Sequence, residues 1–583
     1  MADWFSAAKS NDDEEDEPLD TTAPIQLGVV HHDTVPCATR RSPFLCRHGC
    51  VASSQPLASS VGLDLLRRGA NAAEAAIGVS AALGVTEPCS CGLGGDMFCL
   101  YYDAKTKKVT AFNASGRAPS GLTLEKVRAD CPTADDYKFS AHAVTVPGTA
   151  GGYEDLLKKH GSGNFTLLDC LEPAAKLAEE GFPIQTTTAH HWTAGMPQIT
   201  KWLDEGEAVP LSVDGRGPKT GDLVYNPDLA RVLRDLGEKG AVEGFYKGQT
   251  GQAIVDAVQK HGGVMTMDDL LASKTTFPEP ICVSYHNTKL WEVPPNGQGI
   301  AGLVALKGIE ALETVANDPD DKPGSLASYH RMIEMMRLGF ADAKAHVADA
   351  DHMKVTCEAI LDEERLTNRA KNLFDPNSAA IPGAPDPTSC TVSFQVVDKD
   401  GNAISFVNSN YMGFGTGIVP KGCGFTLQNR GFGFQIGEGK EDHANVLAPS
   451  KRPYHTILPG MITYKDTDEL FATMTNMGGN MQPQGHVQLT VHMVNSGLDP
   501  QAAIDMPRFC IADGTQAGKV LMEKEVPTDV VKKLKQMGHK IQSNVDGHAR
   551  AIFGRAQIIK RDPVTGVLWA GSDGRADGCA MGY

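Results

Sequence analysis

Thr391 stands where the sequence changes abruptly from a proline-rich segment to an apolar one, and its hydroxyl is a candidate nucleophile. Residues 374–390 read FDPNSAAIPGAPDPTSC, in which four prolines and several small residues predict an exposed, extended loop. Residues 392–397 read VSFQVV and predict a buried strand. A hydroxyl residue that heads a strand directly after such a loop is the arrangement that a self-cleaving enzyme with an N-terminal nucleophile requires.

Cleavage of the peptide bond between Cys390 and Thr391 would free an α-amine beside the threonine hydroxyl. An amine in that position can accept the hydroxyl proton and act as a general base. The ordinary interpretation is a loop followed by a strand, because threonine begins many strands. Taken alone, the junction leaves both interpretations open.

The elements around the junction are predicted from periodicity and from turn and capping signals. The strand at 392–397, the turn DKDGN and a second strand at 403–408 together predict a hairpin. Asn71, with Glu74 three residues later, resembles a capping box that opens a helix to about residue 83. The other predicted elements are helices at 57–68, 154–159 and 326–347 and through Val487, Val491 and Val494, a strand at 470–475, and hairpins at 98–113 and 556–570. Mixed helices and strands without an internal repeat indicate an α+β protein.

Composition and charge limit the kinds of partner. The 583 residues are 41% hydrophobic and 21% charged, as in soluble globular proteins. The net charge of −17, without a basic cluster, argues against nucleic acid and anionic membranes. No segment approaches the length of a transmembrane helix.

The N-terminal region predicts a tail rather than a targeting signal. Residues 1–35 are low in apolar content and carry the acidic run 12–17, which predicts a disordered acidic tail. The first residues lack the basic and apolar regions of a secretory signal. The 14 cysteines are scattered, which favours reduced thiols and a cytoplasmic location.

Some short motifs invite metal or cofactor interpretations that their spacing does not support. Cys46 with Cys50, and Cys89 with Cys91, lack the matching second half of a zinc site. The glycines at 92–95 have neither the Lys-Ser/Thr end of a phosphate-binding loop nor the dinucleotide spacing. We therefore predict no metal and no cofactor.

A series of motifs runs through the chain in a fixed order. They are VASSQPLAS at 51–59, GANAAEAA at 69–76, GVTEP at 84–88, GLGG at 92–95, VPGT at 146–149, PPNGQG at 294–299, LGFAD at 338–342, VVDKDGN at 396–402, FGTG at 414–417, KRP at 451–453, GG at 478–479 and MPRF at 506–509. In this order they resemble the γ-glutamyltransferase (glutathione hydrolase) family of N-terminal-nucleophile enzymes, over residues 49–583.

The resemblance implies a fold, a maturation and a catalytic set. The family fold is a four-layer αββα sandwich, made as one precursor that cuts itself into two associated subunits, here 36–390 and 391–583. The family nucleophile lies seven residues before the first Asp of VVDKDGN, which places it at Thr391 and the cut after Cys390. Ser409 matches a hydroxyl residue that hydrogen-bonds the nucleophile. Gly478 and Gly479 match the oxyanion hole.

The implied reaction is acyl transfer from an amide through a Thr391 acyl-enzyme, either to water or to an acceptor amine. The donor would be a γ-glutamyl compound such as glutathione, or a related amide that bears a carboxylate. The expected partners are this small-molecule amide or peptide and the two subunits of the same precursor.

The substrate side departs from the family pattern. Ser115 stands where the family has an arginine for the substrate carboxylate, and the nearby Arg117 is a candidate substitute. Tyr411 replaces an asparagine two residues past the Ser409 position. His455 and Thr456 replace a pair of serines, and Thr456 can still donate a hydrogen bond.

The strongest departure is the segment QNRGFGF at 428–434. Glycine stands where the family has the aspartate that binds the substrate ammonium, and Arg430 adds a positive charge. A buried ammonium without a carboxylate partner is costly, so this pocket should not favour an α-amino group. The pattern resembles a divergent branch with oxamate amidohydrolase-like and cephalosporin-acylase-like members, and it predicts an acyl group that carries a carboxylate.

Two alternatives stay open. One is an amidohydrolase or acylase of the same fold with a non-glutamyl substrate. The other is an inactive paralogue that serves as a binding protein, against which the retained Thr391, Ser409 and glycine pair argue. Val392 and Ser393 replace the family's threonine and histidine after the nucleophile, which bears on the rate of self-cleavage.

Overall fold

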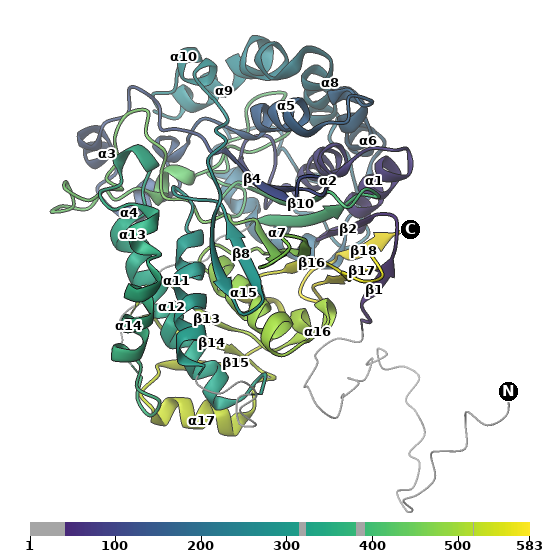
Figure 1. The fold of residues 1–583 in the computed structure, drawn as a ribbon. Coiled ribbons are helices and arrows are strands. Elements are labelled where there is room, and N and C mark those ends of the chain that lie inside the picture. The colour runs from purple at the N-terminus through teal and green to yellow at the C-terminus, as the bar shows by residue number, and fades with distance from the viewer. Residues whose placement is uncertain (1–40, 314–321, 380–390, 517) are drawn as a thin grey trace, which may run out of the picture.

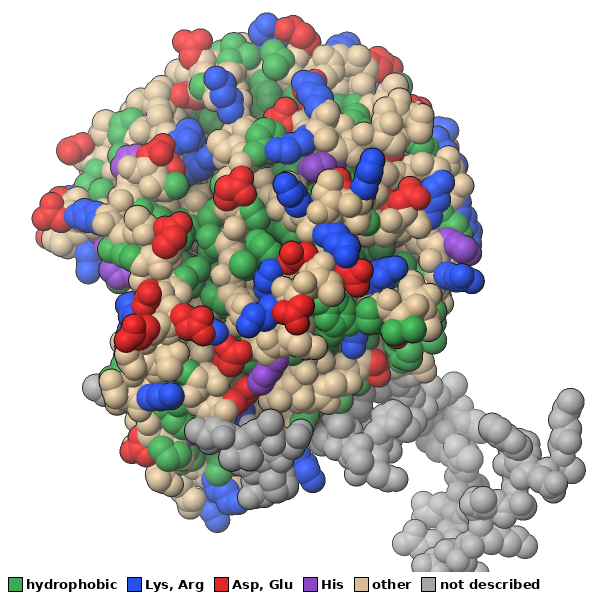
Figure 2. Space-filling view, in the orientation of Figure 1, with side chains coloured by type: hydrophobic (Ala, Val, Ile, Leu, Met, Phe, Trp, Pro, Cys, Tyr) green, Lys and Arg blue, Asp and Glu red, His purple; other side chains and the backbone are tan. Residues whose placement is uncertain are grey.

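The computed structural model describes residues 41–313, 322–379, 391–516 and 518–583 (Figure 1). The predicted tail at 1–35 and the cleavage residue Cys390 therefore lie outside the described residues. Within the described ranges, no helix combines the length and the apolar character that crossing a membrane requires. On the face shown in Figure 2, basic and acidic side chains are interspersed.

Two large sheets form the centre of the molecule. The six-stranded sheet has the order β18-β2-β9-β10-β3-β4, and the seven-stranded sheet has the order β1-β17-β16-β12-β11-β8-β7. The first sheet comprises β18 (Cys579–Gly582), β2 (Cys50–Ser53), β9 (Val392–Val397), β10 (Ala403–Ser409), β3 (Asp96–Asp103) and β4 (Lys108–Ala114). The second comprises β1 (Phe44–Cys46), β17 (Leu568–Ser572), β16 (Ala556–Arg561), β12 (Leu470–Asn476), β11 (Gly460–Tyr464), β8 (Thr288–Glu292) and β7 (Ile281–Tyr285). Every pair of neighbours in both sheets is antiparallel.

Helices cover the outer face of each sheet (Figure 1). The helices that share a core with the six-stranded sheet include α1 (Pro56–Arg67), α2 (Ala72–Thr86), α5 (Thr149–His160), α6 (Leu167–Glu180), α8 (Pro227–Ala241) and α9 (Gly248–Lys260). Those that share a core with the seven-stranded sheet include α11 (Gly299–Leu312), α12 (Leu326–His346), α14 (Glu363–Leu373), α15 (Met481–Thr490), α16 (Pro500–Asp505) and α17 (Thr528–Gln536). A third core, with Phe98 and Val407 from one sheet and Met461 and Ile559 from the other, lies between the sheets. The fold is therefore the predicted four-layer αββα sandwich.

Both faces of the central strand β9 are buried, because one faces the helices and the other faces the second sheet. Val392, Phe394 and Val396 belong to the core beneath the helices, while Val397 faces the second sheet. Gln395 also lies on the sheet-facing side, and its amide donates to Thr475 of β12 over 2.8 Å. The polar member of the alternating pattern therefore ties the two sheets together where water is excluded.

Most predicted elements are confirmed. The capping box at Asn71 and Glu74 is formed, and α2 follows it. The predicted hairpins correspond to β3–β4, β9–β10 and β16–β17. One difference lies at the end of α15, where the chain passes into a π-helical turn at Val491–Asn495 instead of continuing as an α-helix.

Candidate active site

The register of the central hairpin brings Thr391 and Ser409 together. Val392 pairs with Asn408 across the antiparallel strands, so the preceding Thr391 lies opposite Ser409, the last residue of β10. Their hydroxyl oxygens are 3.0 Å apart, and both residues are buried. The backbone N–H of Tyr411 also donates to the Ser409 hydroxyl, over 2.9 Å. The hairpin therefore holds a hydroxyl pair at the strand ends.

Gly478 and Gly479 lie between the end of β12 and the start of α15. Their φ angles are 124° and 58°, a backbone conformation that residues with a Cβ rarely adopt, which explains the glycine pair. Within the described part of the chain, neither N–H donates to an intramolecular acceptor. Two adjacent N–H groups without acceptors are what an oxyanion site needs.

A chain of contacts joins the hydroxyl pair to this glycine loop. The Gln298 amide donates to the carbonyl oxygens of Gly479, over 2.9 Å, and Thr456, over 3.0 Å. The Thr456 hydroxyl in turn accepts from Arg430 Nη2 over 3.0 Å. Arg430 stacks on Tyr411, whose backbone holds Ser409. The predicted catalytic and substrate-side residues thus form one connected cluster.

Arg430 is the most unusual group in this cluster. Its side chain is 1% exposed, and its guanidinium carbon lies 3.6 Å from the centre of the Tyr411 ring. Among the described residues, neither Nε nor Nη1 of Arg430 has a hydrogen-bond partner, and no carboxylate forms an ion pair with the guanidinium. Burial lowers the pKa of Arg430 to about 10, so the group remains charged at neutral pH. A buried cation with unused donors is costly unless an anion joins it.

Asp96 is a buried carboxylate whose charge acts on Arg430 and raises the Arg430 pKa. The Asp96 oxygens already accept hydrogen bonds from other groups. It accepts from the Gly116 N–H over 2.8 Å, from the Gln428 amide over 2.9 Å and from His455 Nε2 over 3.0 Å. Asp96 directly follows the GLGG motif, and sequence reasoning did not identify it. Its position beside a strand start was the only available signal.

His455 is buried and neutral. Desolvation, followed by repulsion from Arg430, lowers the pKa of His455 to about 4, against the raising effect of Asp96. Nε2 therefore carries the proton and donates to Asp96, while Nδ1 accepts the Ile457 N–H over 3.3 Å. His455 thus holds Asp96 in place through a hydrogen bond and adds no charge to the site.

Ser115 and Arg117 lie farther along this contact network. Ser115 donates to Asn113 over 2.7 Å, and Asn296 donates back to the Ser115 hydroxyl over 3.2 Å. Arg117 is bound to Asp349 at 2.9 Å, and its side chain is 38% exposed. The charge of Arg117 is therefore already paired, whereas that of Arg430 is not.

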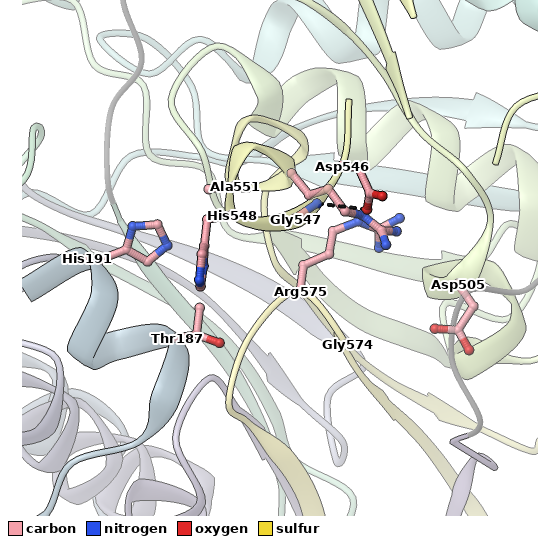
Figure 3. A pocket seen from close by; sticks show the side chains of 10 residues that line it. Thr187, His191, Asp505, Asp546, Gly547, His548, Ala551, Gly574 and Arg575 are labelled. Atoms are coloured by element: carbon pink, nitrogen blue, oxygen red, sulfur yellow. Dashed lines mark hydrogen bonds between the residues drawn. The ribbon is translucent and has the colours of Figure 1, made fainter. Parts of the chain in front are cut away.

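A separate cavity of about 290 Å³ lies elsewhere (Figure 3). Its lining includes His191, His548 and Arg575, and none of its lining residues belongs to the Thr391 cluster. In Figure 3, His191 and His548 lie on one side and Arg575 on the other. Arg575 is held by Glu523 and Asp573, and Arg550, which also lines the cavity, pairs with Glu523 and Glu525. Both arginines of the cavity are therefore already paired.

The αββα sandwich and a threonine at the head of a central strand define an N-terminal-nucleophile hydrolase. Comparison with known proteins identifies which family this is. Residues 58–583 match the family described as Gamma-glutamyltranspeptidase. The chain therefore belongs to the γ-glutamyltranspeptidase family, as the ordered motifs indicated.

Several relatives share nearly the whole chain. The glutathione hydrolase-like YwrD proenzyme of Bacillus subtilis (strain 168) is 32% identical, over 91% of this chain and 98% of its own length. The oxamate amidohydrolase proenzyme of Klebsiella pneumoniae is 30% identical, over 92% of this chain and 98% of its own length. The crystal structure of cephalosporin acylase from Bacillus halodurans has a TM-score of 0.84 at 37% identity, covering 95% of this chain and 99% of that one. The chain is thus an amidohydrolase or acyltransferase of this fold.

Proposed function

We propose that the chain cuts itself between Cys390 and Thr391 and works as two associated subunits, 36–390 and 391–583. The hairpin supports this proposal because it places the Thr391 hydroxyl beside Ser409 at the start of a buried strand. Relatives that span almost the whole chain are named proenzymes. In the uncut chain the Thr391 nitrogen is an amide and cannot act as a base, so activity requires cleavage.

In the proposed reaction the Thr391 hydroxyl attacks the carbonyl carbon of an amide and passes its proton to its own α-amine. Such an amine has an ordinary pKa of about 7.7–8.0, which suits a base near neutral pH. Ser409 hydrogen-bonds the nucleophile, and the N–H groups of Gly478 and Gly479 stabilise the charge that develops on the carbonyl oxygen. The leaving amine takes the proton, and water or an acceptor amine then releases the acyl group.

The acyl group that this site favours carries a carboxylate. The observation that carries this proposal is Arg430, a buried guanidinium with two nitrogens that find no hydrogen-bond partner in the described part of the chain. A substrate carboxylate could accept paired hydrogen bonds from the Arg430 guanidinium, while the Tyr411 ring stacks on the face of the same guanidinium. Gly433 stands where the resemblance implies an aspartate for an ammonium, so the α-amino group of a γ-glutamyl donor gains little here. The names of two relatives, an oxamate amidohydrolase and a cephalosporin acylase, are compatible with a non-glutamyl acyl group.

Three anilides with the same leaving group test the specificity. A γ-glutamyl anilide carries both the carboxylate and the ammonium, a glutaryl anilide lacks the ammonium, and a 4-aminobutyryl anilide lacks the carboxylate. We expect the glutaryl compound to be hydrolysed at least as well as the γ-glutamyl compound, and the 4-aminobutyryl compound poorly. A strong and selective preference for the complete γ-glutamyl group would contradict the proposal. It would favour γ-glutamyl compounds such as glutathione as the acyl donors.

A denaturing gel with N-terminal sequencing tests the maturation. We expect two bands, the smaller of which begins at Thr391. A full-length band that persists, identically in the wild type and in Thr391→Ala, would favour the binding-protein alternative. The cytoplasmic location stays a prediction.

A further inference from the structure

Two histidines and a glutamate meet in the helical layer over the seven-stranded sheet, away from Thr391. His330 and Glu334 lie one turn apart on α12, and His539 follows α17. All three are buried, and one potential ligand atom from each lies within 4.8 Å of the others. More than 200 residues separate the first pair from His539, which is why no local spacing in the sequence indicated the cluster.

The hydrogen bonds fix where the ring protons are. His330 Nε2 lies 2.8 Å from the carbonyl oxygen of Asp375, which only accepts, so Nε2 carries the proton and Nδ1 presents a lone pair. His539 Nε2 lies 2.7 Å from that Nδ1 and donates to it. A neutral His539 ring then directs its Nδ1 lone pair toward Glu334 Oε1, 3.8 Å away. Among the described residues, Nδ1 of His539 has no hydrogen-bond partner.

From this geometry we propose that His330, Glu334 and His539 form a binding site for a divalent transition-metal ion of the zinc type. Two imidazoles and one carboxylate are a ligand set that such ions favour over calcium or magnesium. The backbone carbonyl of Asp375 orients His330 in the way that outer hydrogen bonds orient metal-bound histidines. The ion takes the place of the proton between the rings, bound by His330 Nδ1 and His539 Nε2, and that proton moves to His539 Nδ1, which faces Glu334 Oε1. Because ligands of one zinc ion lie about 3.3 Å apart, the rings must separate by about half an ångström.

Arg337 lies beside Glu334 and should lower the affinity of this site for a cation. Its Nε lies 3.3 Å from Glu334 Oε1, and its Nη1 donates to the carbonyl oxygens of Gln516 and Gly518. The guanidinium holds the carboxylate in place, but its charge opposes a divalent cation. Arg337→Gln should therefore tighten metal binding, whereas loss of a ligand should weaken it.

The site would join the two halves of the mature enzyme. If the chain is cut before Thr391, as proposed above, His330 and Glu334 belong to the large subunit and His539 belongs to the small one. The Ala379 N–H also donates to the Met537 carbonyl over 2.7 Å, close to His539. A bound ion would then resist separation of the subunits and raise the melting temperature.

Chelator-treated protein without a histidine tag, titrated with Zn²⁺ by calorimetry, tests the proposal. We expect one ion per chain, and with Co²⁺ an absorption band typical of four-coordinate cobalt. His330→Ala and His539→Ala should abolish the saturable signal, and Glu334→Gln should weaken binding by about tenfold or more. His492→Ala, which removes a buried histidine outside the cluster, should leave the titration unchanged.

Wild-type protein that binds no zinc, or that binds it equally after the His330 and His539 substitutions, would overturn the proposal. That result would leave a proton between the rings as the occupant. The uncut Thr391→Ala chain should bind the ion as the wild type does. Metal binding in a wild type that never cuts itself would keep the site and reject the proposed maturation, so the two failures are distinguishable.

Discussion

The hydroxyl end of the site and its cationic side are built in different ways. Thr391 and Ser409 are placed by the register of paired strands, and the Gly478 loop continues directly from β12. Arg430, Tyr411 and Thr456 instead lie in loops and short turns that follow the strands. At the first end the hydroxyls of Thr391 and Ser409 bond to each other, whereas at the second end Nε and Nη1 of Arg430 have no hydrogen-bond partner among the described residues.

This difference indicates how the family's chemistry can be retained while its substrate changes. Moving Thr391 or Ser409 would require a new strand register, which would turn every side chain of the hairpin to the other face. Replacing a loop residue such as Arg430 changes charge without disturbing the sheets. We therefore expect substitutions at the hydroxyl end to affect every substrate alike, and substitutions on the cationic side to discriminate between substrates.

The largest expected effect comes from Thr391→Ala, which removes the proposed nucleophile. Cleavage should stop, and turnover should fall by at least about 10⁴-fold on every amide, measured from initial rates and gels. Thr391→Ser, which keeps a hydroxyl, should still cut and should retain part of the activity. If Thr391→Ala remains active, the hairpin does not supply the nucleophile, and the assignment of catalysis to the hydroxyl end is wrong.

Arg430→Met should separate activity from stability. We expect kcat/KM to fall about 100-fold for a glutaryl anilide, since the substrate carboxylate loses a buried cationic partner. Activity on the 4-aminobutyryl anilide should change little. The free energy of unfolding should rise by about 1–3 kcal/mol, because the unsatisfied buried donors disappear.

Arg430→Lys is the matched control, because it keeps the charge but loses the paired donors of the guanidinium. It should recover part of the lost activity on the glutaryl anilide without the gain in stability. Equal losses on carboxylate and neutral substrates in Arg430→Met would show that Arg430 acts on folding or catalysis rather than on recognition. Urea midpoints and kcat/KM values for both variants decide between these outcomes.

Ser409→Ala should lower kcat by about 10- to 100-fold, since one hydrogen bond to the nucleophile is lost. The decrease should be the same for all three anilides, with little change in KM. Ser409→Thr keeps the hydroxyl and should stay close to the wild type. A decrease that depends on the acyl group would mean that Ser409 contributes to substrate recognition. Catalysis and recognition would then not be separated between the two ends of the site.

The sequence predicted these two ends unequally well. Alternation in VSFQVV and the DKDGN turn determine the hairpin, and its register alone puts Thr391 opposite Ser409. The four layers came only from the resemblance, because alternating patterns do not show which sheet covers which. Asp96 and Gln298 were missed, since their roles depend on contacts with residues more than 150 positions away. The pairing of Arg117 with Asp349 was equally invisible, because the two lie 232 positions apart.

His455 provides the smallest expected effect on activity, because it stays neutral at working pH. The pKa of His455 is about 4 in the folded chain, below its ordinary value of 6.5, so the unfolded chain binds the proton more readily. Its contribution to stability is therefore complete above pH 6.5 and is lost as the pH falls toward 4.

His455→Gln should flatten the loss of stability between pH 6.5 and 4 by about 3 kcal/mol, measured by urea unfolding at a series of pH values. It should not move the acidic limb of kcat/KM above pH 6. A shift of that limb would mean that His455 titrates during turnover. The cationic side would then carry a variable charge at His455 beside the fixed charge of Arg430, and its preference for a carboxylate would depend on pH.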